Sequence, residues 1–290
     1  MSSKNKIYKI DLRLKQADLG KTEILRLVLK GIGIPSERLV ETLQGGKTYI
    51  SFYTRSRKKA LSLDKKIENL GLKGVTARVE SFRDADWKEK WKETYRPFKI
   101  TKHILLVPMW MRNSYKTRAK KVIYLDTGLP FGTGLHFTTR TMSRFIEMKE
   151  GSFRDFLDIG TGSGILSVIA GKCGARKIWG IDIDKEAIRT THHNLKENGY
   201  RSEYLKKVDI ESFRENAAFD FVAANLDTQE LLKNRDKLIK LVQPGKYLAV
   251  SGISEENYRG FRKNFDTKKL RCLKIARGDG WASVLYKKKS

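Results

Sequence analysis

The chain contains few of the residues that bind metals or cross-link a fold. Its 290 residues include two cysteines, Cys173 and Cys272, too few for a disulfide framework or a cysteine-based metal site. Its four histidines are scattered along the sequence: His103, His136, His192 and His193. Because these histidines do not form a recognisable ligand set, we expect no metal centre.

Long apolar segments are also missing. No run of about 18 apolar residues is present, which excludes a transmembrane helix. The first residues, Met1 to Lys6, lack the apolar core of a secretory signal. We therefore expect a cytoplasmic protein.

Acidic residues are outnumbered by basic ones. The chain has 60 Lys and Arg against 33 Asp and Glu, a formal net charge of +27, and the excess is spread along its whole length. Such a charge holds a protein near polyanions through counterion release. A general lysine bias that aids solubility explains it equally well. We expect proximity to RNA, without sequence-specific recognition, since no localised patch of arginine and aromatic residues is evident.

The most informative motif is a glycine-rich turn after a short apolar run. Phe156 to Ile159 predicts a strand, and Gly160, Gly162 and Gly164 follow it at alternate positions before an apolar helical pattern begins. Glycines are required where a backbone turns sharply and lies against a bulky ligand. A second predicted strand ends near Asp182, 22 residues after Gly160, where a carboxylate accepts both hydroxyls of a ribose.

Two cofactors compete for such a unit. A dinucleotide site has the spacing G-x-G-x-x-G, whereas here the spacing is G-x-G-x-G, preceded by Asp158, as in methyltransferases that use S-adenosylmethionine (SAM). SAM has no pyrophosphate, and its cationic methionine amine suits the Asp158 carboxylate. A glycine turn without any nucleotide is the alternative, which the correctly spaced Asp182 disfavours.

Two further motifs flank this unit. Asp126 to Thr139 is rich in glycine and threonine just before a helix, and Thr138 or Thr139 suits its N-cap. The segment is either a lid over the methionine end of SAM or simply a loop and a cap. Asn225 ends a buried strand and is followed by Leu226 and Asp227, not by the Pro-Pro-aromatic clamp that holds planar nitrogen acceptors.

The order of predicted elements divides the chain into three parts. Residues 1–80 read strand, helix, two strands, helix, strand, which predicts a small α+β ferredoxin-like domain. Residues 81–128 form a structured connector, with Trp87 and Trp91 on one helix face as a packing anchor and paired strands at 104–107 and 121–125. Strands and helices alternate over 129–290, which predicts a mostly parallel sheet.

The last part predicts the Rossmann-like, seven-stranded α/β domain of SAM-dependent methyltransferases, with ligand at the carboxyl ends of the strands. Its two final strands have no helix between them, so one runs antiparallel. The expected strands are 154–159, 177–183, 203–208, 219–224, 246–252, 270–276 and 281–286. The expected helices are 138–149, 164–173, 185–198, 227–241 and 255–265.

Together these motifs make the chain resemble the PrmA family over about residues 82–286. That resemblance implies SAM-dependent methylation of lysine side chains and of the N-terminal amine of the eleventh protein of the large ribosomal subunit. It also implies a substrate-recognition role for residues 1–80. The implied SAM-binding positions are Thr139, Gly160, Asp182 and Asn225. The chain departs from the family pattern at Leu135, Phe137 and the Leu226-Asp227 pair.

The expected mechanism is an in-line displacement that depends on positioning. Asn225 is the candidate catalytic residue, orienting a neutral amine through its carbonyl oxygen. Cofactor contacts are expected from Asp158 to the methionine amine, from Gly160 and Gly162, from Asp182 to the ribose and from Asp209 to the adenine amino group. Asp209 and Asp227 are also interpretable as ordinary surface carboxylates, and His136 as a histidine that packs the loop.

Two alternatives remain. An RNA methyltransferase fits the charge but lacks the aromatic clamp after Asn225. A catalytically silent ribosome-assembly binder has no need of the intact glycines and Asp182.

Overall fold

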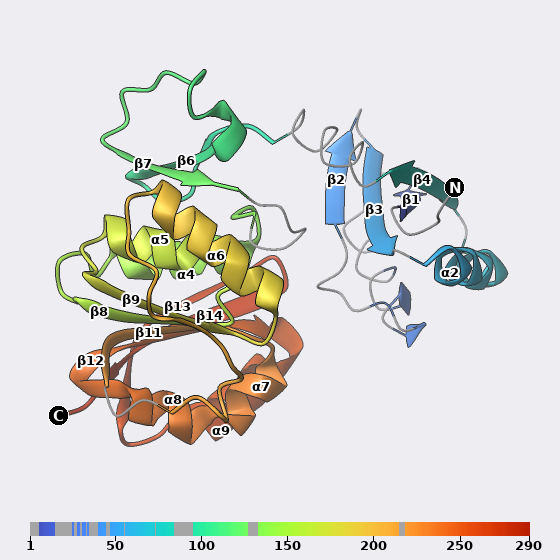
Figure 1. The fold of residues 1–290 in the computed structure, drawn as a ribbon. Coiled ribbons are helices and arrows are strands. Elements are labelled where there is room, and N and C mark those ends of the chain that lie inside the picture. Colours follow the sequence, from blue (N-terminus) through green and yellow to red (C-terminus); the bar gives the residue numbers. More distant parts are fainter. Residues whose placement is uncertain are drawn as a thin grey trace. The chain divides into compact units, whose positions relative to one another are not determined.

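The computed structural model describes residues 6–14, 25, 28–29, 31–32, 34, 40–44, 47–54, 56–72, 74–83, 95–126, 133–214 and 218–290. The chain divides into two compact units, Met1–Tyr95 and Arg96–Ser290. The division falls within the segment predicted as a connector, most of which belongs to the second unit. Figure 1 shows the elements of each unit.

The first unit is built on a four-stranded antiparallel sheet in the order β2-β3-β1-β4. Alternate residues of β1 are buried because successive side chains of a strand point to opposite faces, and they meet the buried face of α2. The first of the two helices predicted within residues 1–80 lies largely outside the described residues, and Trp87 and Trp91 lie entirely outside them. The elements are β1 Lys6–Leu14, β2 Val40–Gln44, β3 Lys47–Thr54, α2 Arg57–Asn69 and β4 Val75–Arg83.

Ser56 and Gly71 mark the two ends of helix α2. The Ser56 hydroxyl accepts a hydrogen bond from the backbone N–H of Lys59, which satisfies one of the free donors of the first turn. Gly71 follows the last turn with φ +57°, a left-handed conformation that favours glycine. A glycine is therefore favoured at the point where the helix stops.

The second unit contains a seven-stranded sheet in the order β10-β9-β8-β11-β12-β14-β13. The first five strands are parallel, and β14 runs antiparallel between β12 and β13. The prediction of one antiparallel strand at the end of the chain is confirmed. The strands are β8 Asp155–Ile159, β9 Lys177–Asp182, β10 Leu205–Lys207, β11 Phe219–Asn225, β12 Val242–Ser254, β13 Leu270–Gly278 and β14 Trp281–Lys288.

Helices cover both faces of this sheet, so its central strand β11 is buried from Phe219 to Ala224. Figure 1 shows α4, α5 and α6 on one face and α7, α8 and α9 on the other. The helices are α4 Phe137–Glu147, α5 Ile165–Lys172, α6 Lys185–Glu197, α7 Thr228–Lys233, α8 Arg235–Leu241 and α9 Tyr258–Phe265, the last preceded by the 3-10 turn η4 Glu255–Asn257.

One predicted helix is wrong. The pattern over 227–241 predicts a single helix, but the chain breaks at Asn234, where φ is −100° and ψ is 11°. The Asn234 amide donates to the backbone carbonyl of Glu230 at 3.0 Å. Asparagine competes for backbone hydrogen bonds in this way, and here it ends α7 and begins α8.

A small sheet of three strands precedes the large one, made of β5 Phe98–Lys99, β6 Ile104–Pro108 and β7 Lys121–Leu125. Strands β6 and β7 are parallel, so the predicted pairing of these two segments is confirmed. They are joined through the short 3-10 turn η3 Met109–Met111 and the basic loop at 112–120. Among the described residues no helix is long and apolar enough to span a membrane.

The side-chain amides of Asn194, in α6, and of Asn198, its C-cap, form hydrogen bonds with the open edge of β7. Asn198 accepts from the backbone N–H of Tyr124 at 2.9 Å and donates to the Tyr124 carbonyl at 2.6 Å. Asn194 makes the same pair with Asp126, both at 2.8 Å. Backbone groups away from water require such partners, so these amides take the place of a neighbouring strand and fix β7 to α6.

Candidate functional site

The turn between β8 and α5 needs its glycines. Gly160, Gly162 and Gly164 have φ of +71°, +55° and +75°, which L side chains rarely adopt. A Cβ at Gly160 would lie 2.7 Å from a methyl of Leu226, and one at Gly164 would lie 2.8 Å from Cγ2 of Thr191. At Gly162 the nearest atom is the Gly160 carbonyl oxygen at 4.0 Å, so the backbone there has open space for a ligand.

Neighbouring elements hold this turn in place. The N–H groups of Gly160 and Thr161 both donate to the carbonyl of Ile181 in β9, at 2.9 and 3.1 Å. From α6, the Thr191 hydroxyl donates to the Gly162 carbonyl at 3.1 Å and the Asn194 amide to the Ser163 carbonyl at 2.8 Å. The turn is therefore pre-formed, with its polar backbone groups already directed.

Asp182 lies against the turn, as its spacing predicts. One carboxylate oxygen accepts from the N–H of Gly162 at 3.0 Å, and the other from the N–H of Asp184 at 2.9 Å. Ile183, the next residue, is 72% exposed, unusual for so large an apolar side chain. The sequence motifs did not point to Ile183, although an apolar residue directly after Asp182 is visible in the sequence.

Asp158 is the one carboxylate of the site that is fully buried, at 1% exposure. Its Oδ2 accepts from the hydroxyls of Ser167 at 2.7 Å and Thr161 at 3.0 Å. Burial raises the pKa of Asp158 to about 7, the two hydroxyl hydrogen bonds oppose the shift, and the charge of Asp182 adds to it. Asp158 is therefore a buried carboxyl that changes charge near neutral pH.

Asn225 ends β11 and contacts the start of α4. Its amide donates to the Thr138 hydroxyl at 3.3 Å, and the same hydroxyl lies 2.8 Å from Nδ1 of His136. The family resemblance points to Thr139, which is buried, but the threonine whose hydroxyl meets Asn225 is Thr138. Sequence reasoning missed this contact because adjacent threonines are indistinguishable by pattern.

The predicted N-cap of α4 is wrong. Helix α4 begins at Phe137, one residue earlier than expected, so both threonines lie in its first turn and His136 is the N-cap. The His136 ring nitrogen Nδ1 accepts from the N–H of Thr138. The His136 ring also packs edge-on against Trp281, with 5.4 Å between ring centroids, which fits the interpretation of a loop-packing histidine.

The two remaining carboxylates are both engaged with backbone groups. Asp209 is exposed and accepts from the N–H and the hydroxyl of Ser212, at 2.6 and 3.0 Å, and these bonds lower the pKa of Asp209. Asp227 is the N-cap of α7, accepting from the N–H groups of Gln229 and Glu230. Asp227 thus has a structural role beside the candidate site.

These parts meet at one edge of the sheet. Strands β9, β8 and β11 are neighbours and parallel, so the ends that carry Asp182, the glycine turn and Asn225 lie side by side. The segment after β10 joins them, since the N–H of Val208 donates to the carbonyl of Asp182 at 2.9 Å. This is the edge where parallel α/β sheets bind their ligands. Over the described part of the chain, no group of three His, Cys, Asp or Glu residues is placed to hold a metal ion.

Comparison with known proteins identifies the family. The model of the family described as ribosomal protein L11 methyltransferase (PrmA) matches residues 30–289. The chain belongs to this family. The resemblance inferred from the motifs is confirmed, and the protein is accordingly a methyltransferase.

Relatives and a solved structure agree with this assignment. The ribosomal protein L11 methyltransferase of Caldicellulosiruptor bescii is 32% identical over 211 residues, covering 72% of this chain and 68% of its own. That of Dictyoglomus thermophilum is 34% identical over 226 residues, covering 76% and 71%. The crystal structure of ribosomal protein L11 methylase from Lactobacillus delbrueckii subsp. bulgaricus is 26% identical, with a TM-score of 0.61, and covers 68% of this chain and 100% of its own. The α/β methyltransferase fold predicted for the larger part of the chain is confirmed.

The pKa of Asp158 leads to a prediction about stability. Between pH 4 and pH 7 the folded protein keeps a proton on Asp158 that the unfolded chain releases, so this residue lowers the free energy of unfolding as pH rises through that window. Asp158→Asn removes the titration. The free energy of unfolding of the variant, minus that of the parent, should therefore increase between pH 4 and pH 8, by up to about 4 kcal/mol at about 1.4 kcal/mol per pKa unit.

Urea denaturation at a series of pH values measures this difference. Asp220→Asn is the control. Burial alone would raise the pKa of Asp220, but the N–H groups of Arg154 and Asp155 and the ammonium of Lys246 outweigh it and lower that pKa. The difference in free energy of unfolding between Asp220→Asn and the parent should stay constant above pH 4.5. A constant difference for Asp158→Asn as well would contradict the burial argument.

Proposed function

We propose that the protein transfers methyl groups from SAM to amino groups of ribosomal protein L11, at lysine side chains and the N-terminal amine, in the cytoplasm. The observation that carries this proposal is the contact of Asp182 with the N–H of Gly162, in the turn after β8, which pairs with the strand β11 that ends at Asn225. The names of the relatives support the choice of substrate.

The residues present fit SAM. Each oxygen of Asp182 accepts one backbone N–H, and a carboxylate oxygen has a second lone pair for a ribose hydroxyl. Gly160 and Gly162 supply backbone without side chains beside it. Asp158, once ionised, would hold the methionine ammonium. The exposed Ile183 side chain would offer an apolar surface to the adenine ring, with Asp209 as acceptor for its amino group.

SAM supplies an electrophilic methyl group when it is bound, and the protein supplies alignment. A lysine amine, with a pKa of about 10.4, must lose its proton before it can attack. The Asn225 amide donates to Thr138, and its oxygen is the atom we assign to accept an N–H of the neutral amine. That hydrogen bond would direct the amine lone pair at the methyl carbon. Thr138 and Thr139, at the start of α4, would border the methionine end.

We assign a separate role to each of the three parts of the chain. The strand order β2-β3-β1-β4 and its antiparallel pairing support a ferredoxin-like fold for residues 1–80, which we assign to recognition of the protein substrate. Residues 129–290 would hold SAM, and 81–128 would act as the structured connector. The net charge of +27 suits a substrate that is met in a ribosomal context.

Specific contacts disfavour the two alternative functions. Leu226 packs on Gly160 and Asp227 caps α7, so these positions do not form the aromatic clamp expected of an enzyme that methylates nucleobases. A silent assembly factor would not need the left-handed glycines or the contact of Gly162 with Asp182.

Replacement of Asp182 tests the cofactor assignment. Asp182→Ala would remove charge-assisted hydrogen bonds to the ribose, each worth about 1.5–3 kcal/mol, so SAM affinity should fall at least tenfold in isothermal titration calorimetry. Glu186→Ala is the control, because it removes an exposed carboxylate that pairs with Arg189 in the first turn of α6. It should change affinity less than about twofold. Equal affinity of Asp182→Ala and the parent would exclude the ribose contact.

Replacement of Asn225 tests the catalytic assignment. A misplacement of about 1 Å costs about 100-fold in rate, so Asn225→Ala should lower kcat on L11 by at least that order in single-turnover assays at saturating SAM. SAM affinity should fall much less. The opposite pattern, with weak SAM binding and a near-normal rate, would make Asn225 a cofactor ligand only.

The neighbouring Asp227→Ala is the control for this experiment. Because Asp227 caps α7, its loss should cost about 1 kcal/mol of stability and leave kcat nearly unchanged. A large loss of kcat in Asp227→Ala, or a further loss when it is added to Asn225→Ala, would assign part of the amine contact to Asp227.

A further inference from the structure

The second unit has a basic end opposite the candidate site. The parallel strands β8 and β9 start there, and the N–H groups of Arg176 and Lys177 donate to the carbonyl of Arg154 at 2.8 and 3.1 Å. The start of β7 joins the same end, because Lys121 pairs with Glu150 and the next residue, Gly151, donates to the carbonyl of Cys173 at 3.1 Å. The side chains of the three basic residues at the starts of β8 and β9 are exposed: Arg154, Arg176 and Lys177.

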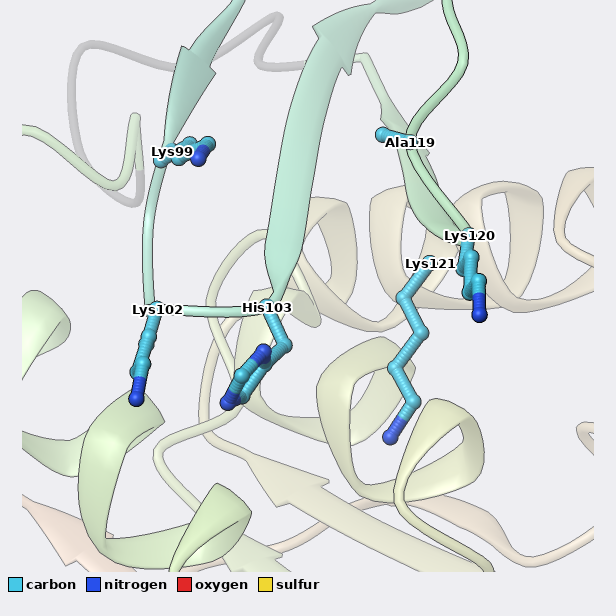
Figure 2. Close-up of a pocket in the computed structure, with 6 residues that line it drawn as sticks. All are labelled: Lys99, Lys102, His103, Ala119, Lys120 and Lys121. Atoms are coloured by element: carbon cyan, nitrogen blue, oxygen red, sulfur yellow. The ribbon is translucent and has the colours of Figure 1, made fainter.

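A pocket of about 410 Å³ lies at this end, beside the start of β7. Figure 2 shows the residues of the β5–β6 turn on one side of it and those that begin β7 on the other. The lining residues are Lys99, Lys102, His103, Ala119, Lys120 and Lys121. Ala119 is the only one of the six without a basic side chain, so four lysines and a histidine surround the pocket, with their carbon stems forming much of its wall.

The two acidic residues nearby offset only part of the charge of this pocket. Glu147 accepts the hydroxyl of Thr101 at 2.5 Å and the N–H of His103 at 3.2 Å, and Glu150 is paired with Lys121. Lys99, Lys102 and Lys120 are exposed. Within the described ranges, none of these three lysines has a carboxylate at ion-pair distance.

We propose that this basic end binds the phosphodiester backbone of RNA. Separate, flexible ammonium groups suit a chain of phosphates, which they bind by releasing condensed counterions. A protein interface is usually anchored by Trp, Tyr or other large side chains, and the pocket lining contains none of these, Ala119 being its one apolar residue. The net charge of +27 adds a long-range attraction of the same sign.

RNA bound at this end would leave the methyl-transfer site open. Strand β7 runs from Lys121 at the pocket to Leu125, next to Asp126, which Asn194 ties to the glycine turn. At about 3.3 Å per residue, the two ends of this five-residue strand lie about 13 Å apart. The inference goes beyond the proposed function and does not depend on it.

Fluorescence anisotropy of the full-length protein with a fluorescein-labelled, 20-nucleotide oligouridine tests the proposal over a range of KCl concentrations. The test variant combines Lys99→Glu, Lys102→Glu and Lys120→Glu. The control combines Lys240→Glu, Lys263→Glu and Lys268→Glu, an equal change of charge at exposed lysines on and after α8 and α9. These lysines also lie toward the strand-start end but outside the pocket, and α8 and α9 cover the face of the sheet opposite to α4, α5 and α6.

The test variant should bind RNA at least tenfold more weakly than the parent. Its slope of log affinity against log salt should fall by about 2, at about 0.7 per lost phosphate contact on a single strand. The control should keep most of the parent's affinity and slope. An unchanged circular dichroism spectrum and melting temperature in both variants verify folding. If the test variant does not fold, the neutral set Lys99→Gln, Lys102→Gln and Lys120→Gln replaces it, with a smaller loss expected in the same direction.

Three outcomes would overturn the proposal. The parent could fail to bind the RNA, or the test and control variants could lose equal affinity, which would show an effect of bulk charge alone. Displacement of the RNA by polyglutamate at an equal concentration of charges would indicate an acidic protein partner instead.

Discussion

The hydrogen bonds from α6 to the turn after β8 are the constraint on which the rest of the site depends. A left-handed turn directs carbonyl groups away from the following helix, and without partners they would be costly to bury. Thr191 and Asn194 satisfy the carbonyls of Gly162 and Ser163. Because Asn194 also binds both backbone groups of Asp126, one side chain sets the glycine turn and the end of β7 together.

Burial and polarity divide the site into two electrostatic regions. Asp158 is enclosed and carries a raised pKa, held by hydroxyls that stabilise its charge only in part. Asp182 lies nearer the surface, with backbone N–H groups on both oxygens. Asp158 would complement the cationic end of a ligand, and Asp182 would complement its polyhydroxyl part. The lysine-lined pocket beside the start of β7 lies at the opposite end of the strands, away from these carboxylates.

The architecture of the second unit could be predicted from the sequence because its signals are local. Buried strands, the glycine turn and the acid at the end of β9 each fall within a short window, and parallel strands bring such windows to one edge. The contacts that complete the site are not local. Asn194 meets Asp126 across 68 residues, and Asn225 meets Thr138 across 87, so no pattern in one segment could indicate them.

The errors of sequence reasoning have the same origin. His136 caps α4 in place of a threonine because the helix starts one residue early, a detail that depends on how the preceding loop packs. Asn234 splits a helix that its apolar periodicity predicts as continuous, because a side chain competes with the backbone. In both cases a polar side chain decided the local geometry through a hydrogen bond that periodicity does not encode.

The most direct test of the proposed activity is mass spectrometry of purified L11 after incubation with the full-length protein and methyl-deuterated SAM, with ribosomal RNA in a parallel reaction. The account predicts trideuteromethyl groups on lysine side chains or the N-terminal amine of L11 and none on the RNA. Label on the RNA, or unlabelled L11 under conditions where SAM binding is demonstrated, would contradict it.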